Sequence, residues 1–181
     1  DGRGRVISDT YYNNKEEVAP NKDGITILAM EYNDQDKVSK ETYLNKKKKP
    51  ETVAGKGYAA VAYGYDDGNQ IFIAYLDKKG NKTYCKDGYA SMVSTYNEDK
   101  KKTSEKYYDT EDKLTKNIKK GYAGVAWVYD ENGNKIEEDY YTTSDVIGPN
   151  DEGISKLINT YDEDNHLISS TYQNEEGKLK S

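Results

Sequence analysis

A tyrosine that returns at a nearly constant interval constrains this chain more than any other feature. The spacings between these closing tyrosines are 33, 31, 33 and 32 residues, and a glycine stands eight residues before each of them. A period of this length is typical of proteins in which one supersecondary unit recurs and contacts its neighbours. The spacing therefore predicts a repeat protein. The closing tyrosines are Tyr32, Tyr65, Tyr96, Tyr129 and Tyr161.

A second tyrosine follows each closing tyrosine after ten or eleven residues, and Tyr11 holds the same place in an earlier, incomplete copy. The chain contains 19 tyrosines but one Phe and one Trp, and 17 of the tyrosines occupy positions of the repeat. Only 34% of the residues are hydrophobic and 33% are charged, so tyrosine rings must supply much of the interior. The second tyrosines are Tyr43, Tyr75, Tyr107, Tyr140 and Tyr172.

The repeat divides the chain into copies of about 32 residues within a single β-repeat domain. Both ends fall inside a copy, and neither resembles the atypical polar cap with which solenoids normally close. We therefore expect these residues to be a piece of a longer protein. The predicted copies span approximately residues 1–31, 32–64, 65–95, 96–128, 129–160 and 161–181.

Each copy reads as a strand, a turn, a second strand and a second turn. In "GYAGVAWVYDENGNKIEEDYY", which begins at Gly121, the dipeptide Asn132-Gly133 predicts a two-residue hairpin loop with positive φ at both residues. "DKKG" ending at Gly80 and "NEEG" ending at Gly177 mark the second turn. The residue after the second turn is usually apolar or proline. It is Val18, Pro50, Leu114, Ile147 or Leu179, with Lys82 as the exception.

The first strand of each copy has an ambiguous pattern. Its most regularly apolar places lie one, four, five and eight residues after the glycine, which also fits one face of a helix. A strand is favoured because the segment is short, begins with glycine and runs into hairpin chemistry. The predicted fold is all-β: antiparallel hairpins laid side by side as a curved or spiralling sheet or solenoid.

A predicted aliphatic seam, four residues after each glycine, packs with the closing tyrosines and joins the copies. A hairpin alone is marginally stable, so each copy depends on its neighbours. The seam residues are Leu28, Val61, Met92, Val125 and Leu157.

Charge and reactive residues argue against several functions. The net charge is −6, and the longest basic run, Lys46 to Lys49, reads as a solvated turn, so nucleic-acid binding is not expected. Cys85 and His166 are each the only residue of their type and belong to no nucleophile or ligand motif. We therefore expect neither catalysis nor a cofactor. No apolar run approaches the ~18 residues of a membrane span.

Acidic residues in the turns suggest calcium but do not fit a calcium loop. Asp130, Asn132 and Asn134 alternate like the first ligands of such a loop. A calcium loop needs a glycine next and a bidentate acid at position twelve, where this chain has Lys135 and Tyr141. A hairpin turn explains the series better, and no metal site is predicted.

At "YDENGN" and "YDDGN" the sequence resembles the bacterial YD, or Rhs-type, repeats, in which Tyr-Asp is followed by a glycine turn and a strand. It is more loosely similar to choline- and glucan-binding cell-wall repeats. It departs from the YD pattern in its longer period and in the added "GYA". The resemblance implies a non-catalytic antiparallel β array of a bacterial protein, used as a shell, spacer or sugar-binding surface.

The place six residues after the glycine varies while its neighbours do not, which is typical of an exposed or ligand-facing position. Trp127 and Tyr63 occupy it in two copies and are the candidates for stacking on a sugar. We expect a glycan- or cell-wall-polymer-binding module of an extracellular or surface-associated protein or of a surface-polymer enzyme. The alternative is a spacer or oligomerisation scaffold without a small ligand, capable of self-association through its repeat ends.

Overall fold

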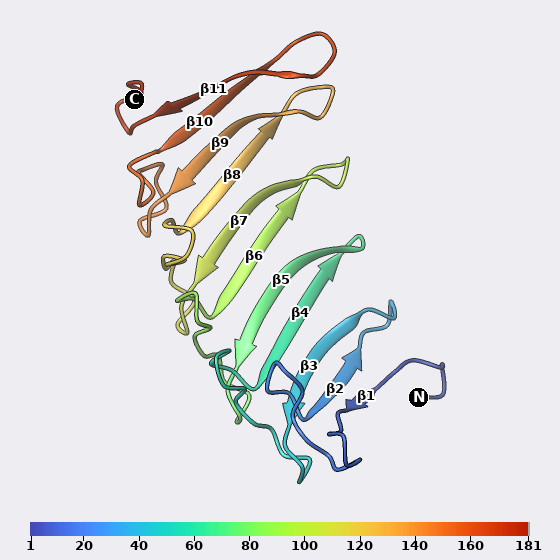
Figure 1. The fold of residues 1–181 in the computed structure, drawn as a ribbon. Helices are drawn as coiled ribbons and strands as arrows, with labels where there is room; N and C mark the ends of the chain where they lie inside the picture. Colours follow the sequence, from blue (N-terminus) through green and yellow to red (C-terminus); the bar gives the residue numbers. More distant parts are fainter. Residues whose placement is uncertain (181) are drawn as a thin grey trace. The chain divides into compact units, whose positions relative to one another are not determined.

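The structure is a computed structural model that describes residues 1–180. These residues contain eleven β-strands and no helix (Figure 1). The all-β prediction is confirmed, including strand rather than helix for the segment before each closing tyrosine. The chain forms two compact units, Asp1–Lys86 and Asp87–Ser181, and their boundary falls inside the copy predicted for residues 65–95.

The first unit contains two complete hairpins and one additional short strand. Strands β2 and β3 form one hairpin, β4 and β5 form the other, and β1 pairs with β2 on its outer side. All these pairings are antiparallel, and strands adjacent in sequence are adjacent in the sheet. The bounds are β1 Ser8–Thr10, β2 Ile27–Tyr32, β3 Val38–Leu44, β4 Ala60–Asp66 and β5 Asn69–Leu76.

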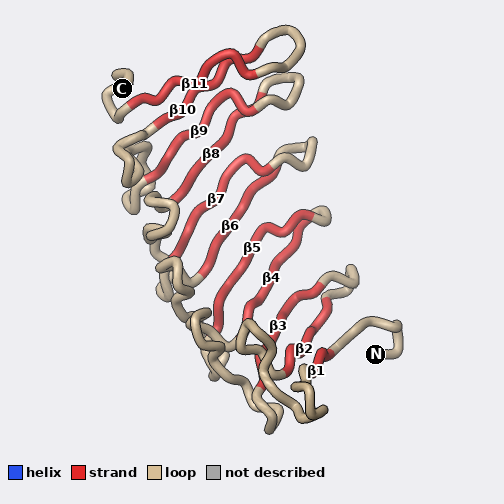
Figure 2. Tube along the Cα trace, viewed as in Figure 1, coloured by secondary structure: helices blue, strands red, loops and turns tan. Residues whose placement is uncertain are grey.

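The second unit contains three hairpins in the same antiparallel order, and the strands, red in Figure 2, are joined by loops at both ends. Strand β11 pairs with β10 and has no further strand beside it among the described residues. The bounds are β6 Ser91–Tyr96, β7 Lys102–Tyr108, β8 Gly124–Tyr129, β9 Lys135–Tyr141, β10 Lys156–Tyr161 and β11 Leu167–Gln173.

The turn between β8 and β9 differs from its prediction. Only Gly133 adopts positive φ, at 83°, and Asn132 does not, so the predicted two-residue loop is wrong here. The amide of Asn134 donates to the carboxylate of Asp130 at 2.7 Å, and the Gly133 amide donates to the Asp130 carbonyl at 3.0 Å. These bonds close a longer loop with a bulge at the glycine. The two-residue form occurs instead between β4 and β5, where Asp67 and Gly68 both have positive φ.

The second turns lie where the sequence places them. Gly80 and Gly177 both have positive φ, and the residue predicted to follow each second turn pairs back across it in a single β-bridge. Lys82 makes this bridge as well as the apolar residues do, because the bridge uses backbone atoms. The bridged pairs are Tyr12–Val18, Leu44–Pro50, Leu76–Lys82, Tyr108–Leu114, Tyr141–Ile147 and Gln173–Leu179.

The core of each unit lies on one face of its sheet, where seam residues meet the second tyrosines. Val125 is 1% exposed and sits directly opposite Tyr140 across the hairpin, and Tyr107 is also 1% exposed. Side chains this deeply buried contribute roughly 1.5–3 kcal/mol each. The cross-strand pairs are Leu28–Tyr43, Val61–Tyr75, Met92–Tyr107, Val125–Tyr140 and Leu157–Tyr172.

Candidate functional site

Trp127 lies on β8, on the same face as the seam, and is half-buried. Its indole Nε1 is inaccessible to solvent and has no hydrogen-bond partner among residues 1–180. The ammonium group of Lys135 lies 5.1 Å from the centre of the indole ring system, at a distance typical of a cation–π contact. Glu138 is its direct cross-strand neighbour on β9, and Lys135 also donates to that carboxylate at 2.9 Å.

Tyr63 occupies the corresponding place on β4 in the first unit and is also half-buried. Its hydroxyl donates to Oε2 of Glu41 on β3 at 3.0 Å. Burial and the nearby Glu41 carboxylate both raise the pKa of the Tyr63 hydroxyl. The two rings predicted to contact a sugar thus have different polar partners and belong to different units.

The most buried charged group lies two residues before a second tyrosine, at Glu105 on β7, and is 6% exposed. Its Oε2 accepts from Lys102 at 2.9 Å and its Oε1 from Lys120 at 2.7 Å, while the Tyr107 hydroxyl also donates to Oε1. Lys120 comes from the loop between β7 and β8, so this carboxylate ties that loop to the hairpin β6–β7.

The pKa values in this cluster follow from its geometry. Burial would raise the pKa of Glu105, but the hydrogen bonds from Lys120, Tyr107 and Lys102 outweigh it, and the pKa lies below the usual value. Burial and the bond to Glu105 raise the pKa of Tyr107. The cluster therefore holds a carboxylate and a neutral phenol, an arrangement that fixes structure and leaves no free base.

Sequence reasoning missed this cluster, although a signal was available. Glutamate recurs two residues before the second tyrosine, at Glu41, Glu105 and Glu138. In each case the carboxylate accepts from a tyrosine hydroxyl, at 3.0 Å from Tyr63 and 3.3 Å from Tyr140 in two of them. A recurrent acid on the buried face, paired with tyrosines, is the pattern that would have revealed it.

The closing tyrosines link consecutive hairpins. The hydroxyl of Tyr129 donates to the carbonyl of Lys102, the first residue of the preceding second strand, at 2.9 Å. The register of each hairpin shifts by one residue directly before its closing tyrosine, and a bulge of this kind re-aims the side chain. The equivalent bonds are Tyr32 to Val6 at 2.6 Å, Tyr65 to Val38 at 3.0 Å and Tyr161 to Lys135 at 3.1 Å.

Of the tyrosines that directly follow the repeat glycine, Tyr58 and Tyr122 pack between the second tyrosines of adjacent hairpins, and Tyr89 packs against one of them. In the first unit the ring centres of Tyr43 and Tyr58 are 5.9 Å apart, and those of Tyr58 and Tyr75 are 4.5 Å apart. These ring-to-ring distances are within the range that favours attraction between aromatic side chains. Burial raises the pKa of Tyr58 to about 12. The pairs in the second unit are Tyr89–Tyr107 at 4.7 Å, Tyr107–Tyr122 at 6.3 Å and Tyr122–Tyr140 at 5.1 Å.

Side chains also connect successive turns. In the first unit Arg5 donates to the carboxylate of Asp36 at 2.7 Å, and Lys37 donates to the carbonyl of Gly68 at 3.0 Å. In the second unit the side-chain amide of Asn134 donates to Asn165 at 2.7 Å. Each donor directly follows a residue with positive φ and reaches a residue with positive φ in the next turn.

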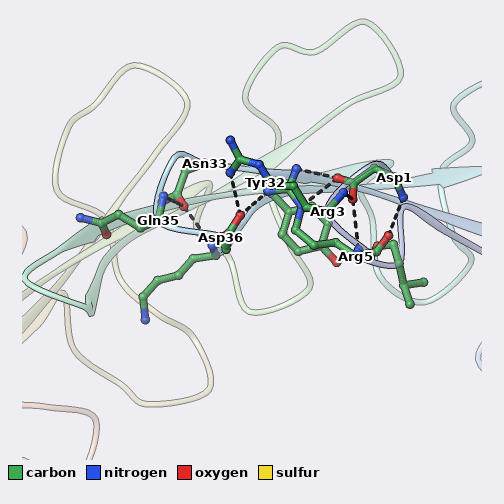
Figure 3. A network of polar contacts seen from close by, with 9 residues as sticks. Asp1, Arg3, Arg5, Tyr32, Asn33, Gln35 and Asp36 are labelled. Carbon is green, nitrogen blue, oxygen red and sulfur yellow. Dashed lines mark hydrogen bonds and ion pairs between the residues drawn. The ribbon is translucent and has the colours of Figure 1, made fainter.

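Figure 3 shows the first of these turn contacts as a network around Asp36. Arg3 and Arg5 both donate to its Oδ1, at 3.0 and 2.7 Å, and Arg5 also donates to Asp1 at 2.8 Å. The guanidinium of Arg5 lies 4.6 Å from the ring centre of Tyr32. The hydrogen bond from Arg3, together with the charges of both arginines and the bond from Arg5, outweighs the opposing effect of burial and holds the pKa of Asp36 below its usual range.

The acidic turns use their oxygen atoms internally. Asp130 accepts from the backbone and the side chain of Asn134, at 2.7 and 3.0 Å, and these bonds lower its pKa. His166, 77% exposed at its side chain, lies 3.1 Å from Asp162 in the turn between β10 and β11. No group of three or more His, Cys, Asp or Glu side chains suited to a metal ion occurs within residues 1–180.

Comparison with known proteins gives no family for the chain. No protein-family model matches it, and no curated protein matches it. Over residues 1–180, no helix has the length and apolar character needed to cross a membrane.

Proposed function

We propose that this chain is a non-catalytic β-hairpin repeat module of a bacterial surface-associated protein, and that its main role is structural. The observation that carries this proposal is the use of the tyrosine hydroxyls. Three closing tyrosines donate to the backbone of the preceding hairpin, Tyr32 donates to the backbone just before β1, and Tyr63 and Tyr107 donate to half-buried or buried carboxylates. Rings anchored in this way stabilise a scaffold and offer few polar groups to a ligand.

The recurrence of the same contacts supports a repeat array, as the resemblance of the sequence to YD-type repeats also suggests. Hydroxyl-to-carbonyl bonds, ring contacts and turn-to-turn bonds recur at intervals that match the sequence period. In such an array each hairpin derives stability from its neighbours, and a curved or spiralling sheet follows if the same step is repeated. This arrangement suits a spacer or shell in an extracellular or cell-surface location.

A second candidate, binding of a glycan or cell-wall polymer, rests on the surroundings of Trp127. A half-buried indole with Lys135 on its ring and Glu138 beside it combines a stacking surface with charged groups that can bond sugar hydroxyls. Because the indole Nε1 is buried, Trp127 would contact a sugar through the face of its ring and not through its N–H group.

A single titration separates the two candidates. Trp127 is the only tryptophan, so its fluorescence reports on this site alone during addition of bacterial wall and capsule polysaccharides. The structural proposal predicts no saturable change with any polymer while the circular dichroism spectrum stays that of the folded chain. A saturable change detected also by calorimetry, lost in Trp127→Ala and kept in Tyr84→Ala, would establish glycan binding and displace it.

A further inference from the structure

The two ends of the chain carry closely related segments. "DGRGRVISDTYYN", residues 1–13, and "DEDNHLISSTYQN", residues 162–174, align without a gap. Over the strand portion, "VISDTYYN" and "LISSTYQN", five of eight residues are identical, whereas the first of these shares four residues with the segment of β3, three with those of β7 and β9 and two with that of β5. Each segment begins with an Asp whose carboxylate accepts from amides two and four residues later. Strands β1 and β11 are therefore the same structural element at opposite ends of the sequence.

Strand β1 shows how this element binds the hairpin β2–β3. Asp9 lies opposite Leu28, with Ser8 opposite Ala29 and Thr10 opposite Ile27. The amide of Tyr11 donates to the carbonyl of Thr26 at 3.0 Å, and the amide of Met30 donates to the carbonyl of Ile7 at 2.9 Å. The Tyr32 hydroxyl completes the contact by donating to the carbonyl of Val6 at 2.6 Å.

Strand β11 presents the same groups on its outer edge, where residues 1–180 contain no neighbouring strand. By alignment, the carbonyl of Leu167 corresponds to that of Val6, and the amide of Tyr172 to that of Tyr11. Tyr172 is 43% exposed, whereas its counterpart Tyr107 inside the second unit is 1% exposed. All seven residues of β11 are uncharged and none is proline, so it lacks the features that usually keep an edge strand from pairing.

We propose that β11 of one molecule binds the β2 edge of a second copy of this chain, in the place that β1 occupies within each molecule. The interface continues the one that already joins β1 to β2, with Ser170 opposite Leu28. The Tyr32 hydroxyl then donates to the carbonyl of Leu167, and His166 takes the position of Arg5 beside Asp36. Association of this kind is head-to-tail, so each molecule can bind one further copy at either end.

Within each molecule, β1 competes for the same edge. It pairs over three residues only, and it is held by the contacts of Arg3 and Arg5 with Asp36 that Figure 3 shows. Because β1 belongs to the same chain as β2, its effective concentration at β2 is high. The β11 strand of another molecule can replace it only at a concentration above this value. The chain as it stands is therefore a monomer at low concentration, and release of β1 exposes the β2 edge to β11 of another copy.

The test releases β1 by a single change. The atoms that bond β2 belong to Ile7 and Tyr11, so by alternation the amide of Asp9 also faces β2, and Asp9→Pro removes it. We expect the weight-average mass of Asp9→Pro, measured by sedimentation equilibrium, to rise at least about two-fold with protein concentration. The unaltered chain stays monomeric over the same range.

A second change identifies the partner surface. The amide of Ser170, which corresponds to Asp9, faces the free edge of β11, so Ser170→Pro blocks that edge while its bonds to β10 remain. The double variant, Asp9→Pro with Ser170→Pro, is expected to return to a monomer. A synthetic peptide of residues 163–175 should likewise dissolve the assemblies of Asp9→Pro, and the same peptide with Ser170→Pro should not.

Two results overturn the proposal. One is a folded Asp9→Pro chain that remains monomeric, and the other is association that survives Ser170→Pro. Circular dichroism verifies folding in every variant. Should Asp9→Pro unfold, Arg5→Ala loosens β1 without a proline. The proposal is then overturned if Arg5→Ala remains monomeric or if its association survives Ser170→Pro.

Discussion

Replacing Glu105 by Gln tests whether the buried carboxylate stabilises the second unit. The change keeps the size of the side chain but leaves Lys102 and Lys120 without their counter-charge. A hydrogen bond to a charged group contributes about 1.5–3 kcal/mol. Both lysines are partly exposed and can be hydrated in the variant, so we expect a total loss of about 2 kcal/mol rather than the sum over three donors. For a unit of this size that lowers the Tm by roughly 8–16 °C.

The pH dependence supplies an independent check. The folded-state pKa of Glu105 lies below its ordinary value, so its stabilising contribution is present above the unfolded pKa of about 4.3 and is lost as the pH falls through the folded pKa. The stability of the unaltered chain should therefore decline below about pH 4.5 more steeply than that of Glu105→Gln.

Thermal melts followed by circular dichroism between pH 3 and 8 measure both effects, with Glu98→Gln as the control, since Glu98 is an exposed acid in a turn of the same unit. The reasoning is refuted if Glu105→Gln and Glu98→Gln melt together, or if the two pH profiles are parallel.

Three further changes are informative. Val125→Asp places a charge at a site that is 1% exposed and should destabilise the second unit by more than about 3 kcal/mol; an unaltered thermal midpoint would contradict the packing of the seam. Tyr129→Phe removes only the hydroxyl that bonds Lys102 and should cost about 1 kcal/mol in urea unfolding, with the exposed Tyr84→Phe as control; equal stabilities would show that this bond contributes nothing. Calcium and EDTA should leave the Tm unaltered, because Asp130 is satisfied by Asn134, and a calcium-dependent rise would identify a metal site.

The architecture was accessible from sequence because the signals were periodic. The closing tyrosine marks the end of the first strand, and β8 does end at Tyr129. Glycines with positive φ at Gly80 and Gly177 lie in the predicted second turns. The ambiguity between strand and helix recurs in every copy, and strand could be chosen because the segment is short, begins with glycine and runs into hairpin chemistry.

Other features depend on contacts that no local pattern carries. The dipeptide Asn132-Gly133 favours a two-residue loop, but the side chain of Asp130 selects a longer one by bonding Asn134. The environment of Glu105 depends on Lys120, fifteen residues away on a connecting loop. The polar contacts of Trp127 and Tyr63 likewise come from neighbouring strands, so sequence placed the rings but not their partners.

The hydroxyl bonds of four closing tyrosines, Tyr32, Tyr65, Tyr129 and Tyr161, are made to backbone carbonyls, and this has an evolutionary consequence. The accepting residues are Val6, Val38, Lys102 and Lys135, whose side chains have little in common. A junction that ignores the side chain of its partner allows one hairpin to follow any other. Duplication or deletion of a tyrosine-to-tyrosine segment would then alter the number of hairpins without compensating mutations, and gene-level recombination could adjust the reach of such a protein one unit at a time.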